Sequence, residues 1–485
     1  MLAKVRTFAL EGVDGVPVTV EVDVRRGLPA FSVVGLPDRA VRESRERVRA
    51  ALANSGVNFP QQRVTVNLAP ASLRKTGPSF DLAIAVAVVA ADGGLPDGDL
   101  RDAVCGELSL SGEIRPIRGA LAMALAARRG GVERMLVPVA NAPESALTDG
   151  LEVIGVPTLV ELLELLRGDR TAEPAVPALA VDGADHDGPD LADVRGQADA
   201  RRALEIAAAG GHNLLMIGPP GAGKTMLARR LPGILPPPTM AEAIEITKVQ
   251  GAAGLARGGL VTERPFRAPH HTISASGLVG GGVPPRPGEI TLAHYGVLFL
   301  DELPEFARTA LEALRQPMEE GEVTVVRGQR AVTYPARAML VAACNGCPCA
   351  RTAGDCTCND VDRIRYARRL SGPLLDRIDL VCELGQPPPP VLVGSRPVVE
   401  GSNRVRERVE TARRIQDDRP SGGRIQVSKA AAARAQLWHL SGRGQDRVLR
   451  LARTIADLAG ADEVEGDHLD EAIGYRMSDP LRAAA

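Results

Sequence analysis

The sequence predicts an α/β protein with three parts: a mixed α/β domain, a nucleotide-binding core on a parallel sheet, and a C-terminal helical lid. A glycine-rich motif follows the apolar run 214–217, and strand, glycine-rich loop and helix in this order indicate a phosphate-binding loop, or P-loop. A second apolar run, 297–300, ends in two carboxylates. Residues 1–167 alternate between strand and helix patterns, whereas residues 387–485 show helical spacing.

Composition excludes several classes of protein. The 485 residues are 45% hydrophobic but only 2% aromatic, so the core must consist of aliphatic side chains. The formal net charge of −2 excludes an overall basic protein, and any contact with nucleic acid must come from local arginine clusters. We find no uncharged apolar span of about 18 residues and no signal-peptide pattern, which predicts a cytoplasmic protein without a membrane partner.

Residues 1–167 carry the pattern of a compact α/β domain. Apolar and polar residues alternate on both sides of the turn sequence 12–15, which is typical of a β-hairpin. In the stretch 38–55 the apolar residues recur at helical spacing, and Pro37 precedes them as it often precedes a helix. The same reasoning predicts strands at 31–34, 64–68, 104–108, 135–139 and 153–156, and helices at 81–91, 119–129 and 158–166.

Two stretches of this domain resemble Lon-type proteases. Residues 75–82 resemble the Gly-Pro-Ser turn that holds the Lon nucleophile, and residues 106–119 resemble the segment before the Lon catalytic lysine. A serine hydroxyl needs an amine as its base in such a site, but this chain has Leu121 at the place of the lysine. The resemblance implies a Lon-protease-like domain without the catalytic lysine, in which Ser79 is structural. A Lon-like peptidase is kept as an alternative.

The nucleotide-binding core is expected over residues 191–386, after a linker at 168–190 that is rich in Pro, Asp, Gly and Ala. In its P-loop, backbone N–H groups and the start of the following helix, expected at 226–231, would face phosphate oxygens. Lys224 would reach the β- and γ-phosphates of ATP, and the Thr225 hydroxyl would bind Mg²⁺. The eight nucleotide-binding residues are Gly218, Pro219, Pro220, Gly221, Ala222, Gly223, Lys224 and Thr225.

The two carboxylates after the second apolar run complete the expected magnesium site. Asp301 would hold Mg²⁺, partly through water, and Glu302 would polarise the attacking water. A third apolar run, 339–343, is followed by Asn345. This order resembles AAA+ ATPases, in which a polar residue at this position, called sensor 1, contacts the γ-phosphate and the water.

Arg377 lies in the segment 370–379, at the end of an expected helix. In a ring of ATPases an arginine at this place can be offered to the ATP of the neighbouring subunit, where it stabilises charge on the transferring phosphoryl group. The alternative is an arginine that only pairs with Asp376 or Asp379.

Several further motifs closely resemble the bacterial magnesium-chelatase-like AAA+ proteins of the ComM/YifB family. The matching segments are 264–272, 280–282, 287–290, 314–319 and 370–380, together with the Asp301–Glu302 segment. The resemblance covers nearly the whole chain and implies a hexameric ATPase that moves branched or single-stranded DNA, without sequence preference, during natural transformation. A chelatase-type motor that remodels a protein or a metal-insertion partner is the alternative.

Two basic segments of the core have open roles. Residues 322–334 alternate around Arg327-Gly328-Gln329-Arg330, which predicts a β-hairpin with a basic tip. Arg327 and Arg330 would grip DNA phosphates in the ring pore, or else only keep an exposed hairpin soluble. His270 and His271 are adjacent and point in different directions, which favours a structured loop over a metal site.

The cysteines predict a second metal site. Cys347, Cys349, Cys356 and Cys358 form two short pairs, and four thiolates from two loops can surround Zn²⁺ tetrahedrally. Redox-active or idle thiols are the alternative. The related family usually reads Asn-Pro-Cys-Pro-Cys-Gly, whereas this chain has Gly346 in place of the first proline and Ala350 in place of the glycine, which changes the stiffness of the loop.

The C-terminal part, 387–485, is expected to be a helical lid with helices at 405–416, 429–440 and 447–458. By resemblance to AAA+ modules, Arg443 matches the sensor 2 arginine, which reaches the γ-phosphate of its own subunit. Arg447 is the second candidate for that role, and a plain surface arginine is the alternative.

Overall fold

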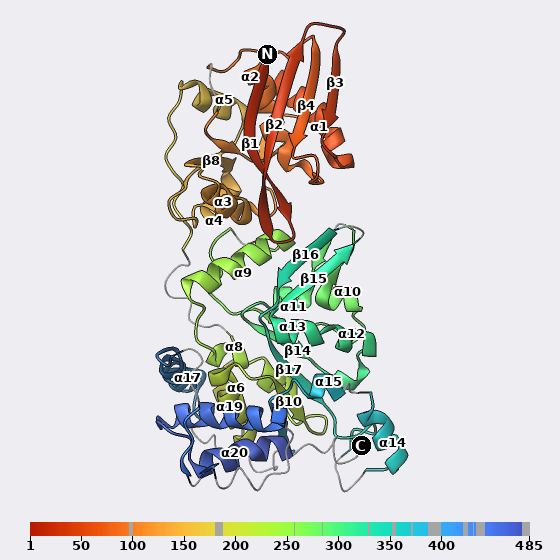
Figure 1. The fold of residues 1–485 in the computed structure, drawn as a ribbon, viewed down its shortest axis with the longest axis vertical. Coiled ribbons are helices and arrows are strands. Elements are labelled where there is room, and N and C mark those ends of the chain that lie inside the picture. Colours follow the sequence, from red (N-terminus) through yellow and green to blue (C-terminus); the bar gives the residue numbers. More distant parts are fainter. Residues whose placement is uncertain are drawn as a thin grey trace. The chain divides into compact units, whose positions relative to one another are not determined.

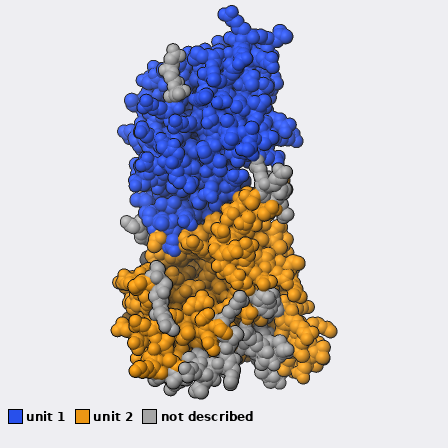
Figure 2. Space-filling view, viewed as in Figure 1, with its two compact units in different colours: residues 1–182, 240–262 blue, residues 183–239, 263–485 orange. Residues whose placement is uncertain are grey.

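The computed structural model describes residues 1–96, 100–179, 188–256, 258–283, 285–327, 330–351, 356–369, 372–386, 399–420, 425–429, 431–432 and 442–477. Contacts between Cα atoms divide the chain into two compact units (Figure 2). Unit 1 consists of residues 1–182 and 240–262, and unit 2 consists of residues 183–239 and 263–485. In the part of the chain that is described, no helix combines the length and apolar character needed to cross a membrane.

Unit 1 is built on a seven-stranded mixed sheet with the order β3-β4-β2-β1-β5-β8-β9 (Figure 1). The predicted hairpin is confirmed, since β1 and β2 pair antiparallel from Leu2↔Asp23 to Glu11↔Asp14. β1 also pairs with β5 in parallel, and β5, β8 and β9 continue in parallel. The strands are β1 (Leu2–Glu11), β2 (Asp14–Arg25), β3 (Ala30–Val34), β4 (Arg63–Ala69), β5 (Ala103–Val104), β8 (Arg134–Pro138) and β9 (Glu152–Val156).

Helices cover both faces of this sheet because successive strand residues point to opposite sides. On β8, Leu136 joins the core that contains helix α2, whereas Met135 and Val137 join the core that contains helix α3. Asp38 caps helix α1 by accepting a hydrogen bond from the Val41 N–H. The main helices are α1 (Arg39–Asn54), α2 (Asp81–Ala91), α3 (Ala120–Arg129), α4 (Ala142–Ser145) and α5 (Leu159–Arg167).

The strand predicted at 104–108 is interrupted. Val104 belongs to β5 and the Cys105 N–H still donates to the Leu136 carbonyl of β8 (3.0 Å), but the chain then leaves the main sheet. The Gly106 N–H donates to the Ser79 carbonyl (3.1 Å), and the Gly106 carbonyl accepts from the Leu82 N–H (3.2 Å). Residues 107–108 form β6, which pairs instead with β7 (Ile114–Arg115). The backbone of Ser79 therefore helps to fix this turn.

Helix α9 (Met240–Ala253) belongs by its contacts to unit 1, although its residues lie inside the predicted core range 191–386. It packs against α3, where the Gly119 N–H donates to the Gly251 carbonyl (3.1 Å). Lys248 Nζ also donates to Asp14 Oδ1 (2.9 Å) at the tip of the β1–β2 hairpin. The core sequence thus contributes a helix to unit 1.

Unit 2 contains the predicted parallel sheet, with the order β11-β14-β17-β10-β18. Every residue of β10, β14 and β17 is buried, as expected for parallel strands covered on both faces. The strands are β10 (Leu214–Ile217), β11 (Phe266–Arg267), β14 (Val297–Leu300), β17 (Met339–Cys344) and β18 (Leu380–Glu383).

Helices α6 (Ala198–Gly210), α17 (Ser402–Asp417), α19 (Gly442–Leu458) and α20 (Gly466–Met477) share one hydrophobic core with this sheet. The C-terminal helices therefore lie in the same compact unit as the P-loop strand, and a separate lid beginning at residue 387 remains a prediction. Most of the helix predicted at 429–440 lies outside the described residues.

The single helix predicted at 226–231 is wrong. Helix α7 (Lys224–Ala228) ends after one turn, and α8 (Leu231–Ile234) starts with Pro232 in its first turn. Proline lacks an N–H and disfavours helical backbone at the residue before it, so the helix cannot run through unbroken.

Candidate nucleotide-binding site and cysteine cluster

The strand order of unit 2 brings the predicted nucleotide residues to one edge of the sheet. β17 lies between β10 and β14, and all three strands are parallel. Their carboxyl ends are therefore neighbours, and the P-loop, Asn345 and Asp301 each follow one of these ends. Ligands in open parallel sheets bind in such a place.

Lys224 and Asn345 meet at this edge. Lys224 Nζ donates to the carbonyls of Gly218 (2.6 Å) and Pro219 (3.0 Å) and to Asn345 Oδ1 (3.1 Å). Burial lowers the pKa of Lys224, although negative charge at Asp301 opposes the decrease. The ammonium group thus lies in the mouth of the P-loop beside Asn345, where phosphate oxygens could take over its carbonyl contacts.

Thr225 and Asp301 form the second contact across the sheet edge. Thr225 Oγ1 donates to Asp301 Oδ2 at 2.7 Å. A hydroxyl and a carboxylate oxygen are the hard ligands that Mg²⁺ prefers, and Mg²⁺ keeps most of its waters in such sites. The two side chains therefore fit the magnesium site that the sequence predicts.

The backbone of the P-loop explains two of its glycines. The Gly218 N–H donates to the Cys344 carbonyl (3.2 Å), and a Cβ at Gly218 would lie 2.6 Å from the Leu384 carbonyl oxygen. Gly223 has φ 92°, a conformation that glycine adopts without strain. The loop can therefore turn tightly against the ends of β17 and β18.

His271 is a site residue that sequence reasoning missed. Its Nδ1 atom lies 3.2 Å from Glu302 Oε2. Its ring lies against that of His270 at a tilt of 34°, with ring centroids 4.1 Å apart, so the expectation that the two histidines point in different directions is wrong. Glu302 itself has a left-handed backbone (φ 53°), and its side chain is 60% exposed. The sequence favours a structured loop for the histidine pair, but it contains no signal that places His271 beside this carboxylate.

Arg377 pairs with a residue that the sequence did not suggest. Its Nη2 atom donates to Glu319 Oε1, from helix α13 (Arg315–Glu320). The Arg377 side chain is only 12% exposed, whereas that of Glu319 is 56% exposed. To reach a neighbouring subunit, Arg377 would have to exchange Glu319 for the phosphate.

Of the two candidates for the sensor 2 arginine, the structure describes the side chain of Arg447 but not that of Arg443. Arg443 is the second residue of helix α19, but its side chain lies outside the described residues. The pKa of Arg447 is lowered by burial, and Asp379 and Asp376 oppose this effect through their charges. Asp379 also accepts a hydrogen bond, at Oδ2, from the N–H of Asn213, the residue directly before β10 (3.1 Å). The carboxylate that acts on Arg447 is thus held at the start of the P-loop strand.

The predicted basic-tipped hairpin is present as β15 (Glu322–Arg327) and β16 (Arg330–Pro335). The strands pair antiparallel up to Arg327↔Arg330, so the loop has two residues. The side chains of Arg327 and Arg330 lie outside the described residues. The backbone therefore places both arginines at the tip of the hairpin.

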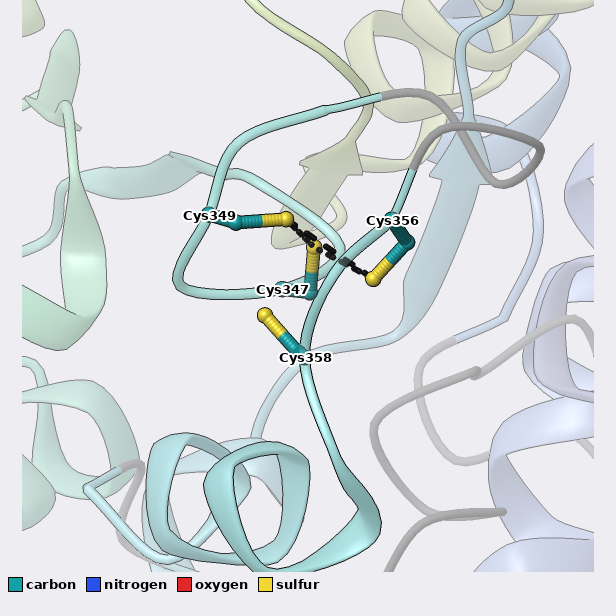
Figure 3. Close-up of side chains that lie close together, drawn as sticks. All are labelled: Cys347, Cys349, Cys356 and Cys358. Atoms are coloured by element: carbon teal, nitrogen blue, oxygen red, sulfur yellow. Dashed lines mark hydrogen bonds between the residues drawn. The ribbon is translucent and has the colours of Figure 1, made fainter.

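Four cysteines converge from two loops after β17 (Figure 3). Cys347 Sγ lies 3.3 Å from Cys349 Sγ and 3.6 Å from Cys356 Sγ, and Cys349 and Cys356 are 3.7 Å apart. The four sulfurs, including that of Cys358, all lie within 4.8 Å of one another. The sequence-predicted set of metal ligands is thus brought together.

The surroundings of the sulfurs favour thiolate at two of them. Backbone hydrogen bonds at Arg351 and Thr357 lower the pKa of Cys349 to about 6. A backbone hydrogen bond and the guanidinium of Arg363, whose Nη2 lies 3.4 Å from the sulfur, lower the pKa of Cys356. Burial instead raises the pKa of Cys347 to about 12. Metal binding requires the thiolate form.

Comparison with protein families and known proteins gives a consistent result. Three family models of the magnesium chelatase subunit ChlI match this chain. The model described as 'Magnesium chelatase, subunit ChlI' matches residues 190–389, and the model described as 'Subunit ChlI of Mg-chelatase' matches residues 20–141. The model of the ChlI C-terminal part matches residues 426–476. The chain is 43% identical to YifB of Escherichia coli over 503 residues, which covers 99% of this chain and 98% of YifB. It is 42% identical to the competence protein ComM of Haemophilus influenzae over 501 residues, or 98% and 97% of the two chains.

The likeness to Lon is only partial. A Lon protease of Rhizobium meliloti is 29% identical over 201 residues, which covers 37% of this chain and 25% of that protease. Leu121, which stands at the place of the Lon catalytic lysine, lies in helix α3 and is 1% exposed. Its aliphatic side chain cannot act as the base that the lysine amine provides in Lon proteases.

Proposed function

Because the chain belongs to the magnesium-chelatase-like ComM and YifB family of AAA+ proteins, we propose that it is an ATP-driven motor that moves branched or single-stranded DNA. Its role would be branch migration in recombination during natural transformation. The carrying observation is the convergence of Lys224 with Asn345 and of Thr225 with Asp301 at one sheet edge. The full-length similarity to a competence protein supports DNA as the substrate. The chelatase-type alternative is not favoured.

The positions of the side chains at the nucleotide site support a separate role for each of them in ATP hydrolysis. Lys224 would hold the β- and γ-phosphates of ATP, with Thr225 and Asp301 holding Mg²⁺, which supplies positive charge to the transferring phosphoryl group. Glu302 would accept a proton from the attacking water, and Asn345 would orient that water. Each role places a polar group where charge develops in the reaction.

The motor would work as a ring, which we propose to be a hexamer. Arg377 would stabilise the transferring phosphoryl group of a neighbouring subunit, and Arg443, or else Arg447, would contact the nucleotide of its own subunit. Arg327 and Arg330 would hold DNA phosphates, which gives binding without sequence preference. Because its proposed substrates are ATP and DNA, we propose the cytoplasm as its location.

We propose ATP and Mg²⁺ for the nucleotide site and Zn²⁺ for the cysteine cluster. The fit of each rests on the side chains present: a hydroxyl and a carboxylate at the nucleotide site, and four sulfurs at the cluster. The Lon-like domain, residues 1–167, would act without peptidase chemistry because Leu121 stands in the place of the lysine.

Two assays test this function. Branch migration of a four-way DNA junction and ATP hydrolysis are measured for the wild type, for Lys224→Ala and for the control Lys4→Ala, whose side chain is 53% exposed. We expect Lys224→Ala to abolish both activities and Lys4→Ala to retain them. ATP hydrolysis without any ATP-dependent movement of DNA would refute the DNA motor but not the ATPase. Peptide cleavage that disappears in Ser79→Ala would favour the peptidase.

A further inference from the structure

The sulfur geometry of the cysteine cluster matches that of a tetrahedral zinc ion. Four sulfurs about 2.3 Å from one Zn²⁺ ion lie about 3.8 Å apart. The separations among Cys347, Cys349 and Cys356, which are 3.3, 3.6 and 3.7 Å, are close to this value, and the sulfur of Cys358 lies within 4.8 Å of each of them. A disulfide would require about 2.05 Å, and all four cysteines are free.

Four protein sulfurs leave no coordination position open for water or substrate. Zinc sites of this kind are structural, whereas catalytic zinc keeps one position for a reacting molecule. The guanidinium of Arg363 lies 3.4 Å from Cys356 Sγ and would offset part of the negative charge of four thiolates. The cluster is therefore suited to holding the chain in place.

The cluster is joined closely to the nucleotide site. Cys347 follows Asn345 by one intervening residue, and Asn345 accepts the hydrogen bond from Lys224. On the other side, Cys358 lies just before helix α14 (Asp360–Ala367). This helix carries the buried Tyr366, whose pKa is raised by burial, while the backbone of Asn345 acts on the same hydroxyl and opposes the increase.

We infer that zinc bound by Cys347, Cys349, Cys356 and Cys358 positions Asn345 for ATP hydrolysis. This inference rests on the ATPase function proposed above. The zinc ion would bind cysteines near both ends of the chain segment that runs from Asn345 to helix α14. Both ends of that segment would then be fixed. The four cysteines are positioning residues for Asn345, and they touch no substrate.

The physical reason is the entropy of the loop. Without the ion, the chain between Cys347 and Cys358 is no longer closed into a loop and gains conformational freedom. Asn345 is attached directly to that segment, so its amide would sample more positions. A small displacement of a group that orients a reacting water slows the chemical step more than it weakens binding.

Metal content tests the site itself. Zinc per chain is measured by mass spectrometry after purification under reducing conditions with zinc present, for the wild type, Cys358→Ser and the control Cys105→Ser. Cys105 belongs to unit 1, where it is buried, and its sulfur lies 3.3 Å from Thr7 Oγ1. We expect one zinc per chain in the wild type and the control, and none in Cys358→Ser. A wild type without zinc would overturn the inference.

Kinetics test the link to Asn345. In Cys358→Ser we expect kcat for ATP to fall about tenfold or more, with KM and the affinity for a fluorescent ATP analogue little changed. In an Asn345→Ala background the same substitution should have no further effect on kcat. Loss of zinc with an unchanged kcat, or additive losses in the double variant, would overturn the inference.

Two further measurements separate the possible failures. Thermal unfolding shows whether Cys358→Ser still folds, and zinc release from the wild type by a thiol-blocking reagent gives the same comparison without a substitution. If the wild type holds zinc but hydrolyses no ATP, the proposed function fails while the metal site stands, and the link to Asn345 fails with the function.

Discussion

The imidazole of His271 lies against the carboxylate of Glu302, with 3.2 Å between Nδ1 and Oε2. The ring of Phe306 packs edge-on against the same imidazole, with 6.4 Å between the ring centroids. The two residues come from different segments, since Glu302 follows strand β14 and His271 follows β11. Glu302 is more than half exposed, so packing alone does not fix its side chain. The histidine is therefore the group best placed to orient it.

Replacing His271 by alanine should slow ATP hydrolysis. We expect kcat to fall by about tenfold, as is typical when the group that orients a reacting side chain is removed, with KM little changed. Steady-state ATPase assays measure both constants. His270→Ala is the matched control, because it removes the neighbouring ring but keeps the contact between His271 and Glu302. Equal losses in the two variants would contradict a specific role for His271.

Arg377 and Glu319 allow a test of the ring. We expect Arg377→Ala to lower kcat by about a thousandfold or more, the size of an arginine-finger effect. Mixing Arg377→Ala with Glu302→Gln should restore activity, because some interfaces then combine an intact Glu302 with an intact Arg377 from the neighbour. A mixture that stays as inactive as its components would show that Arg377 serves its own subunit.

Glu319 should restrain Arg377 before the ring assembles. Glu319→Gln removes the charge that holds the guanidinium, so we expect higher ATPase activity at low protein concentration and little change at saturation. Glu320→Gln is the control for removing a negative charge from the same helix, because Glu320 accepts a hydrogen bond from Gln316, whereas Arg377 pairs with Glu319. The concentration dependence of ATPase activity measures the effect. Slower hydrolysis in Glu319→Gln at every concentration would contradict the restraint.

The stability of unit 1 depends on a buried ion pair. Asp81 is fully buried and binds Arg47 through two hydrogen bonds, of 2.6 and 3.0 Å, while Ser44 donates a third. Arg47→Met would leave an uncompensated buried carboxylate, which costs about 3–5 kcal/mol. Hydrogen exchange of the peptides that cover helices α1 and α2 measures this loss.

The exposed Arg49 on the same helix provides the control for this pair. Arg49→Met should leave the exchange of both helices unchanged. The double variant Arg47→Met/Asp81→Leu should recover most of the loss, since it removes both buried charges. If the double variant were as unstable as Arg47→Met, the packing of Arg47 rather than its charge would explain the effect.

The main contacts of the nucleotide site could be predicted because they follow from strand order. Each of Lys224, Asp301 and Asn345 comes just after a buried apolar run, and parallel strands end at the same sheet edge. Likewise, the hairpin of unit 1 follows from its alternation and turn residues. Local pattern and global structure agree at these places.

Other contacts could not be predicted, because they depend on how loops and helices meet in three dimensions. His271 reaches Glu302, and Glu319 reaches Arg377, through contacts that no periodicity encodes. Helix α9 packs against α3 in unit 1, and the local sequence of a helix does not indicate which other helix it will contact. Ala350 has φ 58°, so the position where the family usually has glycine does require a left-handed backbone here.

The basic hairpin tip gives the most direct test of the DNA proposal. If Arg327 and Arg330 each neutralise one phosphate, replacing both by alanine should weaken DNA binding and reduce the salt dependence of binding by about two ion equivalents. Fluorescence anisotropy with a labelled DNA junction at several salt concentrations measures both quantities. Arg308→Ala with Arg315→Ala removes the same charge from exposed sites in unit 2 and should change the slope little. An unchanged slope in the hairpin variant would place the DNA contacts elsewhere, since counterion release counts phosphate contacts directly.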